Sequence, residues 1–445
     1  MLLSRWFRPS HAAWSLPRRN ISCTYKPTSR HQQHNNKAST STSTLSSPTP
    51  TNTSSSENPE PSSPLSSYNT AILNDVSSTK MPIPPLSPPS SPSSATIKTR
   101  ILIISDTHSS VPQTKEDNPI NTEDELETPR GKLYAPSGFR FPLPEADVVL
   151  HCGDLTKRGQ PEEIRKTFSM LRKLRAPLKL VIAGNHDLML DKIFYEERYG
   201  GEELEHEEVN QIIKEAEVDG VKYLTEGTYD FDLANGSRLR IFASPNTPAY
   251  GYWAFQYEAG EHNFDIPADV DIAMTHGPPL GILDQTRVNN NAGCGNLFRS
   301  IHRAKPKIHC FGHIHEAWGA HLIRWKADAD IPRFKEDDAQ QQQTAGSQPI
   351  ISPATAADWE NSRLIYTLTP PPISIPTNDS VVGREDQNLL ELSKDRGCYL
   401  DLTEGENMLK QGEETLFVNA SIMSIRYRPS QMPWVIDIDL PRTTA

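Results

Sequence analysis

The sequence predicts an α/β fold of the α+β type, a mixed sandwich of sheets and helices, and three observations support this prediction. Short apolar runs recur along the chain and stop abruptly at polar residues, as in residues 178–187, Leu-Lys-Leu-Val-Ile-Ala-Gly-Asn-His-Asp. Segments with apolar residues at helical spacing separate several of these runs. Strand-like runs without intervening helices then close the chain at 415–419, 422–427 and 434–438. Strands alternating with helices, then strands alone, favour a mixed α/β sandwich whose apolar strands are covered on both faces.

The apolar residues are unevenly distributed, which predicts one globular domain with long appendages. The chain has 445 residues, of which 36% are hydrophobic and 38 are prolines. Apolar content concentrates between residues 101 and 325 and again after 415, so we expect the domain to comprise 99–325 and 413–442. Residues 1–98 are first basic and then rich in Ser, Thr and Pro, which predicts a disordered extension. The range 326–412, with its Gln and Pro runs, is expected to be a largely disordered insertion.

Charge and cysteine usage limit the partners and the compartment. A formal net charge of −11 argues against a nucleic-acid binder that works by broad phosphate neutralisation, whereas a small phosphoester or nucleotide substrate remains compatible. The 5 cysteines are scattered and odd in number, so they form no disulfide framework. No apolar run reaches the roughly 18 residues of a membrane span. We expect an intracellular protein, cytoplasmic unless the Arg-rich, acid-free residues 1–37 direct it to mitochondria. No oligomeric state is predicted.

The helices and the hairpin turn follow from terminal residues and periodicity. Pro161 and two acidic residues open a helix whose apolar positions 164, 168, 171 and 174 share one face. A second helix is expected around residues 209–216. Asn235-Gly236 lies between apolar runs and predicts a hairpin turn. A short amphipathic helix is expected over residues 296–303.

Five apolar strands end in residues that can bind metal ions. Ligands in open α/β sheets collect at the carboxyl ends of strands, so we expect the five ends to converge on one site. The candidate metal ligands are Asp106, His108, Asp154, Asn185, His276, His313 and His315. The polar stretch 109–145 is expected to form a loop beside this site.

The types of these residues predict two metal ions. Mixed imidazole and carboxylate ligands suit manganese, iron or zinc, whereas magnesium and calcium prefer oxygen alone. Seven ligands are too many for one such ion, but two ions that share a carboxylate would accommodate them. Asp154 is the candidate bridge, because Gly153 before it allows close backbone approach. Two cations about 3.5 to 4 Å apart would lower the pKa of a shared water and hold the attacking and leaving oxygens at phosphorus.

Other polar residues near these ligands have expected roles of their own. His186 is left over from the ligand count, so we expect it to protonate the departing alkoxide or to stabilise charge in the transition state. Asp187 is expected to orient a neighbouring imidazole as an acceptor. His151, inside an apolar run, is expected to be a hydrogen-bonded core histidine. Arg158 is either a phosphate contact or a solvent-exposed side chain, and the sequence does not separate the two.

The order of these motifs resembles the signature of the calcineurin-like metallophosphoesterases, D-x-H, G-D-x(4)-G, G-N-H-D/E, a lone His and G-H-x-H. The chain carries Asp106-Thr107-His108, Gly153-Asp154 through Gly159, Gly184-Asn185-His186-Asp187, His276, and Gly312-His313-Ile314-His315. The resemblance implies a four-layer sandwich of two mixed β-sheets flanked by helices, the calcineurin-like phosphoesterase fold. It assigns one metal to Asp106, His108, Asp154 and His315. The resemblance gives the other metal to Asp154, Asn185, His276 and His313, with His186 as the catalytic imidazole.

Longer stretches are similar to the metallophosphoesterase-domain-containing subfamily, itself similar to class III cyclic-nucleotide phosphodiesterases. The stretches are His151-Cys-Gly-Asp-Leu-Thr, Thr275-His-Gly-Pro-Pro-Leu-Gly281, and the run from Pro306 to Glu316. Some members of that subfamily lack the first histidine of the last motif and are weak enzymes, but His313 is present here. Lys157 precedes Arg158 where protein serine/threonine phosphatases carry Asp, which disfavours a protein phosphatase.

The predicted function is therefore that of a dinuclear metal-dependent phosphoesterase. It would hydrolyse small phosphodiesters, with cyclic nucleotides among the candidates, by attack of a metal-bridging hydroxide on phosphorus. Two alternatives stay open: a phosphomonoesterase, and a nucleotide-binding scaffold with little turnover.

Overall fold

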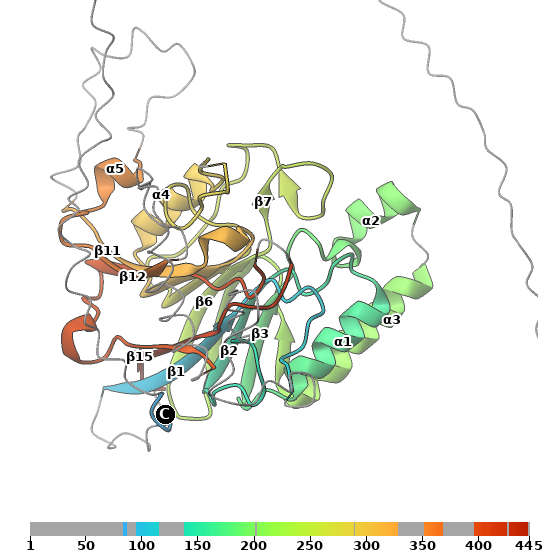
Figure 1. Ribbon diagram of the computed structural model, residues 1–445, viewed down its shortest axis with the longest axis horizontal. Helices are drawn as coiled ribbons and strands as arrows, with labels where there is room; N and C mark the ends of the chain where they lie inside the picture. The colour runs from blue at the N-terminus through green and yellow to red at the C-terminus, as the bar shows by residue number, and fades with distance from the viewer. Residues whose placement is uncertain are drawn as a thin grey trace, which may run out of the picture. The chain divides into compact units, whose positions relative to one another are not determined.

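Two large β-sheets stack face to face in the computed structural model (Figure 1). The structure describes residues 83–86, 95–114, 138–200, 203–288, 290–327, 351–367, 396–424 and 427–443. The first sheet has six strands in the order β13 (Cys398–Asp401), β15 (Trp434–Pro441), β1 (Thr96–Ile104), β2 (Val148–Cys152), β3 (Leu178–Ile182) and β4 (Val221–Tyr223). The second has seven, in the order β12 (Arg363–Thr367), β11 (Gly319–Arg324), β14 (Glu414–Asn419), β10 (Ile308–Phe311), β9 (Ile272–Thr275), β6 (Arg238–Ser244) and β5 (Gly227–Asp232). A small ribbon pairs β7 (Thr247–Pro248) with β8 (Gln256–Tyr257).

Both large sheets are mixed, as the sequence predicts. In the first sheet β1, β2, β3 and β4 run parallel, while β15 pairs antiparallel with β1. In the second sheet β6, β9, β10 and β14 run parallel, while β5 and β11 pair antiparallel with their neighbours. The carboxyl ends of the two parallel sets carry the sequence motifs. The five strand ends therefore lie at one edge of the two sheets, as the sequence predicts.

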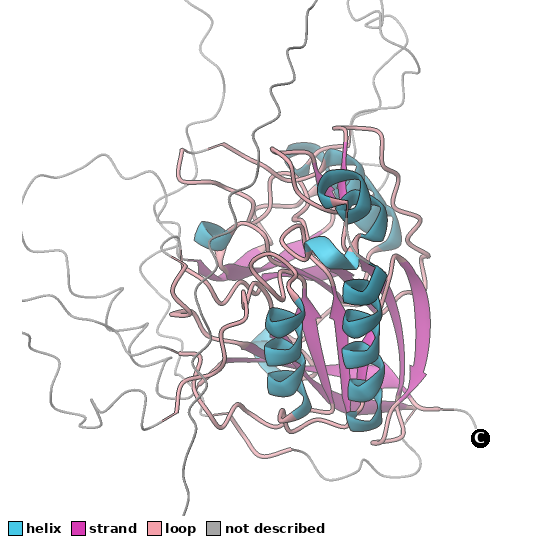
Figure 2. Ribbon diagram, turned by 90° about the vertical axis from the view of Figure 1, so that its right-hand side faces the viewer, coloured by secondary structure: helices cyan, strands magenta, loops and turns pink. Residues whose placement is uncertain are grey.

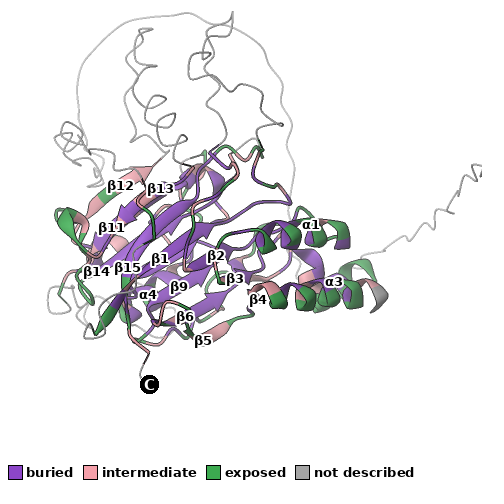
Figure 3. Ribbon diagram, turned by 90° about the horizontal axis from the view of Figure 1, so that it is seen from below, coloured by how far each residue is buried: buried purple, intermediate pink, exposed green. Residues whose placement is uncertain are grey.

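Helices cover the outer face of each sheet and complete four layers. The helices are α1 (Pro161–Arg172), α2 (Lys192–Tyr199), α3 (Glu203–Ala216), α4 (Gly295–Ala304) and α5 (Pro353–Ala356). Helices α1 and α3 lie against the first sheet (Figure 2), and their apolar residues belong to one cluster with residues of that sheet. Those of α4 and α5 pack on the second, and a third apolar cluster fills the space between the sheets. The central strands of both sheets are accordingly buried almost throughout, whereas the edge strands β5 and β12 are only partly buried (Figure 3). The four-layer sandwich is confirmed.

Local signals place most of these elements. Helix α1 begins at Pro161 with Glu162 and Glu163 in its first turn, and its buried face includes Ile164 and Phe168. The predicted helices α3 and α4 are also present. The turn between β5 and β6 has Gly236 at a φ of 87°, a left-handed conformation that glycine adopts without strain.

The segment 422–427, expected to be a strand, is not one in its described residues, 422–424 and 427, and the chain turns back so that Met423 pairs with Pro429. The backbone N–H of Ile422 donates to Ser105 O at 2.9 Å, so the chain crosses to the first sheet directly after β14. Tyr427 N–H then donates to Ser424 O at 2.8 Å, and Tyr427 has a φ of 53°. Pro429, which has no N–H to donate, pairs with Met423 across this turn. The strand prediction was wrong because tertiary pairing with β1 overrides the local apolar pattern.

Parts of the two predicted appendages are ordered. Strands β12 and β13 and helix α5 fall within 326–412, and β12 and β13 each pair with a strand of a large sheet. Strand β1 begins at Thr96, inside the expected extension. Residues 1–82, 87–94, 328–350 and 368–395 of these two ranges lie outside the described residues, and so do residues 115–137 of the predicted loop 109–145. Within the described part of the chain, no helix combines the length and apolarity needed to cross a membrane.

Each sheet carries one buried histidine bonded to a threonine on a neighbouring segment. His151 on β2 lies 2.9 Å from Thr107 Oγ1, and His309 on β10 lies 2.9 Å from Thr275 Oγ1. Both rings are fully buried, which confirms the prediction of a core histidine at 151. Burial lowers the pKa of His309 to about 3. Both rings are therefore expected to be neutral at physiological pH.

This burial predicts a loss of stability on acidification. In the unfolded chain His309 takes up a proton near pH 6.5, whereas in the folded protein it does so only near pH 3. The contribution of neutral His309 to the free energy of unfolding is therefore full above pH 6.5 and falls as the pH drops below it. At pH 5 the expected cost is about 2 kcal/mol for His309. His309→Gln should remove that part of the slope. Urea unfolding of both proteins at pH 7 and pH 5, with a chelator present, measures it, and equal slopes in the two proteins would contradict it.

Candidate metal centre

The polar residues that end the strands lie side by side at the carboxyl edge of both sheets. Hydrogen bonds join the loops after β1 and β2, with Asp106 N–H donating to Gly153 O at 2.9 Å and His108 N–H to Asp154 O at 3.0 Å. The N–H of His313, after β10, donates to both carboxylate oxygens of Asp106 at 3.1 Å. Residues from the two sheets thus form one cluster, as the sequence predicts.

Four of the predicted ligands form a first group. The ligating atoms of Asp106, His108, Asp154 and His315 all lie within 4.8 Å of one another, and all four residues are buried. His315 Nε2 is 3.3 Å from Asp106 Oδ1, and His108 Nε2 is 3.6 Å from Asp154 Oδ2. A single ion could be surrounded by these four atoms.

The other three predicted ligands lie on the opposite side of Asp154. His276 Nε2 is 3.3 Å from Asp154 Oδ1 and 3.0 Å from Asn185 Oδ1. The ring of His313 is 5.1 Å from that of His276 and is only partly buried. The two oxygens of Asp154 therefore face different groups: Oδ2 faces the first and Oδ1 the second.

Backbone carbonyls orient two of the imidazoles. His108 Nδ1 donates to Thr156 O at 2.9 Å, and His276 Nδ1 donates to Cys152 O at 2.8 Å. A carbonyl only accepts, so the proton is assigned to Nδ1 and the lone pair to Nε2. In both rings Nε2 faces the cluster, which is the arrangement that metal-binding histidines normally have.

The loops that carry these residues adopt unusual backbone conformations. Asp106, His108, Asp154 and His313 have φ values of 52°, 43°, 52° and 67°, a region that residues other than glycine seldom occupy. Such strain concentrates at functional sites. Two of the motif positions require glycine because a side chain would clash with a ligand. A Cβ on Gly312 would lie 2.0 Å from Asp106 Oδ2, and one on Gly184 would lie 2.3 Å from Asp154 Oδ1.

The electrostatics keep the two carboxylates ionised, lower the pKa of His108 and His313 through burial, and raise the pKa of His315 beside Asp106. Burial by itself would raise the pKa of Asp106, but the hydrogen bond and charge of His315 outweigh it and hold that pKa well below its usual range. Burial by itself would also raise the pKa of Asp154, but the charges of His276 and His108 outweigh it and lower that pKa. Burial lowers the pKa of His313 to about 4. Anionic oxygens and neutral ring nitrogens are the forms that bind cations.

The residues present fit a metal centre. Two buried carboxylates carry negative charge where water is largely excluded, and such charge requires a positive partner. His108 Nε2 and His315 Nε2 face each other at 3.4 Å, so a proton or a cation must lie between their lone pairs. The donor set of imidazole nitrogen and carboxylate oxygen suits manganese, iron or zinc. We conclude that this cluster can hold divalent metal.

His186 lies at the edge of the cluster and is partly exposed. Its N–H donates to Asp154 Oδ1 at 2.9 Å, and its ring Nδ1 donates to Lys157 O at 2.9 Å. Its ring contacts the edge of His108, with centroids 4.8 Å apart. With Nδ1 engaged, Nε2 is the ring atom left for a substrate.

The structure contradicts the role expected for Asp187 and does not test the role expected for Arg158. Asp187 does not orient an imidazole, because its buried carboxylate accepts from the N–H groups of Leu155, Thr156 and Gly184 and from Thr156 Oγ1. It ties the two ligand loops together instead. Arg158 is exposed, and its backbone N–H donates to Glu163 Oε2 at 2.9 Å. A phosphate contact by its side chain stays a prediction.

Two aromatic residues near the cluster were missed by the sequence reasoning. The ring of Trp253 lies 4.1 Å from that of His186. The ring of Tyr427 lies 5.2 Å from that of His108 and 5.0 Å from that of His315. The sequence contains one weak indication that Trp253 could bind a ligand, the aromatic run Tyr-Gly-Tyr-Trp at 250–253. Tyr427 had none, since its segment resembled a strand.

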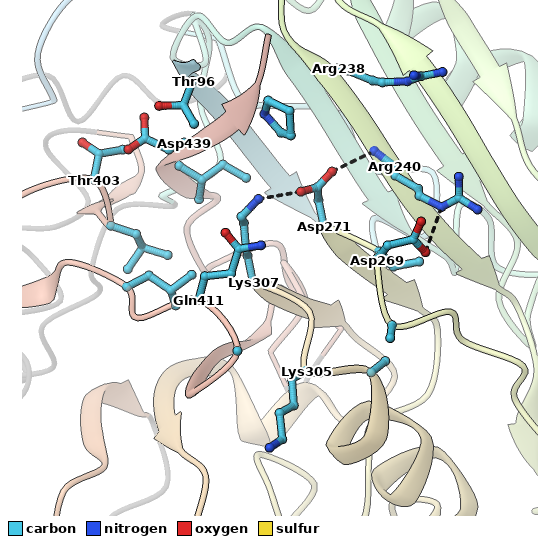
Figure 4. Close-up of a pocket in the computed structure, with 18 of the residues that line it drawn as sticks. Thr96, Arg238, Arg240, Asp269, Asp271, Lys305, Lys307, Thr403, Gln411 and Asp439 are labelled. Atoms are coloured by element: carbon cyan, nitrogen blue, oxygen red, sulfur yellow. Dashed lines mark hydrogen bonds and ion pairs between the residues drawn. The ribbon is translucent and has the colours of Figure 1, made fainter. Parts of the chain in front are cut away.

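A cavity of about 600 Å³ lies at the opposite ends of the same strands (Figure 4). It is lined by Thr96 at the start of β1 and by Asp271 and Lys307, which directly precede β9 and β10. Its charges pair with one another: Lys307 Nζ is 2.6 Å from Asp271 Oδ1, and Arg240 Nε is 3.3 Å from an oxygen of Asp269. The cavity contains none of the residues of the strand-end motifs, so we place the functional site at the histidine cluster.

Comparison with known proteins agrees with this site. The family model for the calcineurin-like phosphoesterases matches residues 99–317. Metallophosphoesterase domain-containing protein 1 of Homo sapiens is 35% identical over 184 residues, which cover 40% of this chain and 56% of that protein. Probable rhamnogalacturonate lyase C of Emericella nidulans is 35% identical over 187 residues, 41% of this chain and 16% of that protein. The chain thus matches less than two thirds of each relative. The family match covers all the clustered residues, and the chain belongs to the calcineurin-like phosphoesterase superfamily, in the subfamily of the metallophosphoesterase domain-containing proteins.

Proposed function

We propose that this protein is a metal-dependent phosphoesterase that hydrolyses small phosphodiesters, with cyclic nucleotides among the candidate substrates. The observation that carries the proposal is the position of Asp154. Its two carboxylate oxygens face two separate groups of donors at 3.6 and 3.3 Å. A carboxylate so placed can be shared by two cations, and two adjacent cations are a common means of hydrolysing phosphoesters.

The proposed ligand sets follow the two groups. Asp106, His108, Asp154 and His315 would hold one ion. Asp154, Asn185, His276 and His313 would hold the other. When bound, the ions would lower the pKa of a water molecule and neutralise charge on the phosphoryl oxygens. Manganese, iron and zinc all fit the donor types.

The remaining step falls to His186. In hydrolysis the water oxygen bonds to phosphorus, the ester P–O bond breaks, and the departing alkoxide takes up a proton. The bond from His186 Nδ1 to Lys157 O fixes the ring and directs Nε2 toward the substrate. We assign His186, protonated on both ring nitrogens, as the donor of its Nε2 proton to the leaving oxygen, and the proton released by the attacking water restores this form. The presence of both His186 and His313 favours an enzyme over a nucleotide-binding scaffold with little turnover.

Removal of the metal tests the proposal. Dialysis against a chelator should abolish hydrolysis of a chromogenic phosphodiester, and added manganese, iron or zinc should restore it, because in the proposed reaction the bound ions activate the water molecule. Mass spectrometry of the purified protein should find up to two metal ions per chain. Activity that survives complete metal removal would refute the assignment.

Comparison of substrates decides between the two kinds of phosphoesterase. A phosphodiesterase should hydrolyse a p-nitrophenyl diester faster than the corresponding monoester at equal metal loading. The reverse order would identify a phosphomonoesterase. Binding of nucleotides by calorimetry without turnover of either substrate would instead favour the scaffold.

A further inference from the structure

Two aromatic side chains border His186 at the exposed side of the metal centre. Trp253 lies between β7 and β8, and its ring is tilted by only 30° from that of His186 at 4.1 Å. Tyr427 lies in the segment between β14 and β15, and its ring is 6.5 Å from that of His186. These two residues, far apart in the sequence, face the imidazole from different loops. We call them the aromatic pair.

Backbone hydrogen bonds hold the segment of Trp253, and backbone strain marks the position of Tyr427. The N–H of Ala254, next to Trp253, donates to Asn185 O at 3.2 Å, and the N–H of Phe255 donates to Asp191 Oδ2 at 2.9 Å. Tyr427 has a φ of 53°, a costly conformation for a residue other than glycine. Its side chain is nevertheless 55% exposed although its ring contacts two ligand histidines. Burial in the core therefore does not explain the position of this ring.

The role of His186 indicates what the pair contacts. A residue that protonates the leaving oxygen must face that oxygen, so side chains beside it face the organic group attached to the oxygen. We infer that Trp253 and Tyr427 bind a planar aromatic group on the leaving side of the substrate, which makes nucleoside phosphodiesters better substrates than aliphatic ones. This inference rests on the proposed phosphoesterase function. Aromatic rings recognise nucleobases by stacking, without requiring a particular base.

A matched pair of substrates tests the inference. Adenosine 5′-methyl phosphate and ribose 5-methyl phosphate share the same primary leaving oxygen and differ by the base. The wild type should prefer the first by about 5- to 100-fold in kcat/KM, with adenosine rather than AMP as the product. In Tyr427→Ala and Trp253→Ala this ratio should fall toward one. Tyr427→Phe and Trp253→Phe, which keep a ring, should retain most of it.

A control and the contrary outcomes complete the test. Tyr250, in the same loop as Trp253, is 84% exposed, so Tyr250→Ala should leave the ratio unchanged. If the pair only supports His186, the alanine variants would slow both substrates equally and the preference would persist, which overturns the inference. A wild-type ratio near one, or release of AMP alone, also overturns it while the phosphoesterase function stands. Absence of hydrolysis of both substrates overturns the function and the inference together. If Trp253→Ala does not fold, the Tyr427 variants, in which an exposed residue is changed, test the preference for the adenosine substrate by themselves.

Discussion

Replacing Asp154 by asparagine is expected to abolish phosphodiester hydrolysis, with a loss on the order of 10³-fold or more in kcat/KM. The estimate corresponds to several kcal/mol of charge stabilisation at 1.36 kcal/mol per factor of ten. Asparagine keeps one oxygen but removes the negative charge, and only one side of the amide can donate a lone pair. The carboxylate that now faces both donor groups, at 3.6 and 3.3 Å, would then serve one of them.

Metal content distinguishes this cause from misfolding. The Asp154→Asn protein should contain fewer metal ions per chain than the wild type by mass spectrometry. Its circular dichroism spectrum should be unchanged. Asp265→Asn, the same change at an exposed aspartate, should retain both activity and metal. A variant at position 154 with full activity and two ions per chain would show that this residue does not bridge the metals.

Replacing His186 by alanine should lower kcat by about 10²- to 10⁴-fold while both metal ions are retained. The ring of His186 contacts the edge of His108, and its backbone N–H, which donates to Asp154, survives the substitution. Loss of the ring should therefore remove proton donation without removing a ligand. Normal metal content would separate this variant from Asp154→Asn.

The identity of the leaving group sharpens the test of His186. A p-nitrophenolate departs without protonation, whereas an alkoxide needs a proton as the P–O bond breaks. His186→Ala should thus be much less harmful with a p-nitrophenyl diester than with an alkyl diester. An equal loss on the two substrates would contradict the assignment of His186 as proton donor. It would favour a role in stabilising charge on the phosphoryl oxygens.

Much of the fold could be predicted because its signals are local. The first turn of α1, with Pro161 followed by two acidic residues, and the Asn235-Gly236 turn each specify a conformation through a few adjacent residues. The strand ends were also readable, since apolar runs that stop at Asp, Asn or His are uncommon without a ligand. Residues 422–424 were misread because an alternating apolar pattern predicts a strand, whereas here Ile422 pairs with Ser105 and Met423 pairs back with Pro429.

The sequence by itself determined the types of ligand, their order and their attachment to strand ends, because strand and turn preferences act over neighbouring residues. Only the tertiary structure decided that Asp154 faces two donor groups and that Asp187 joins loops rather than orienting an imidazole. It also decided that Trp253 and Tyr427 flank His186, and that β12 and β13 complete the sheets. These features depend on contacts between residues distant in the chain. Such contacts form only when the two sheets pack together and bury their shared apolar faces.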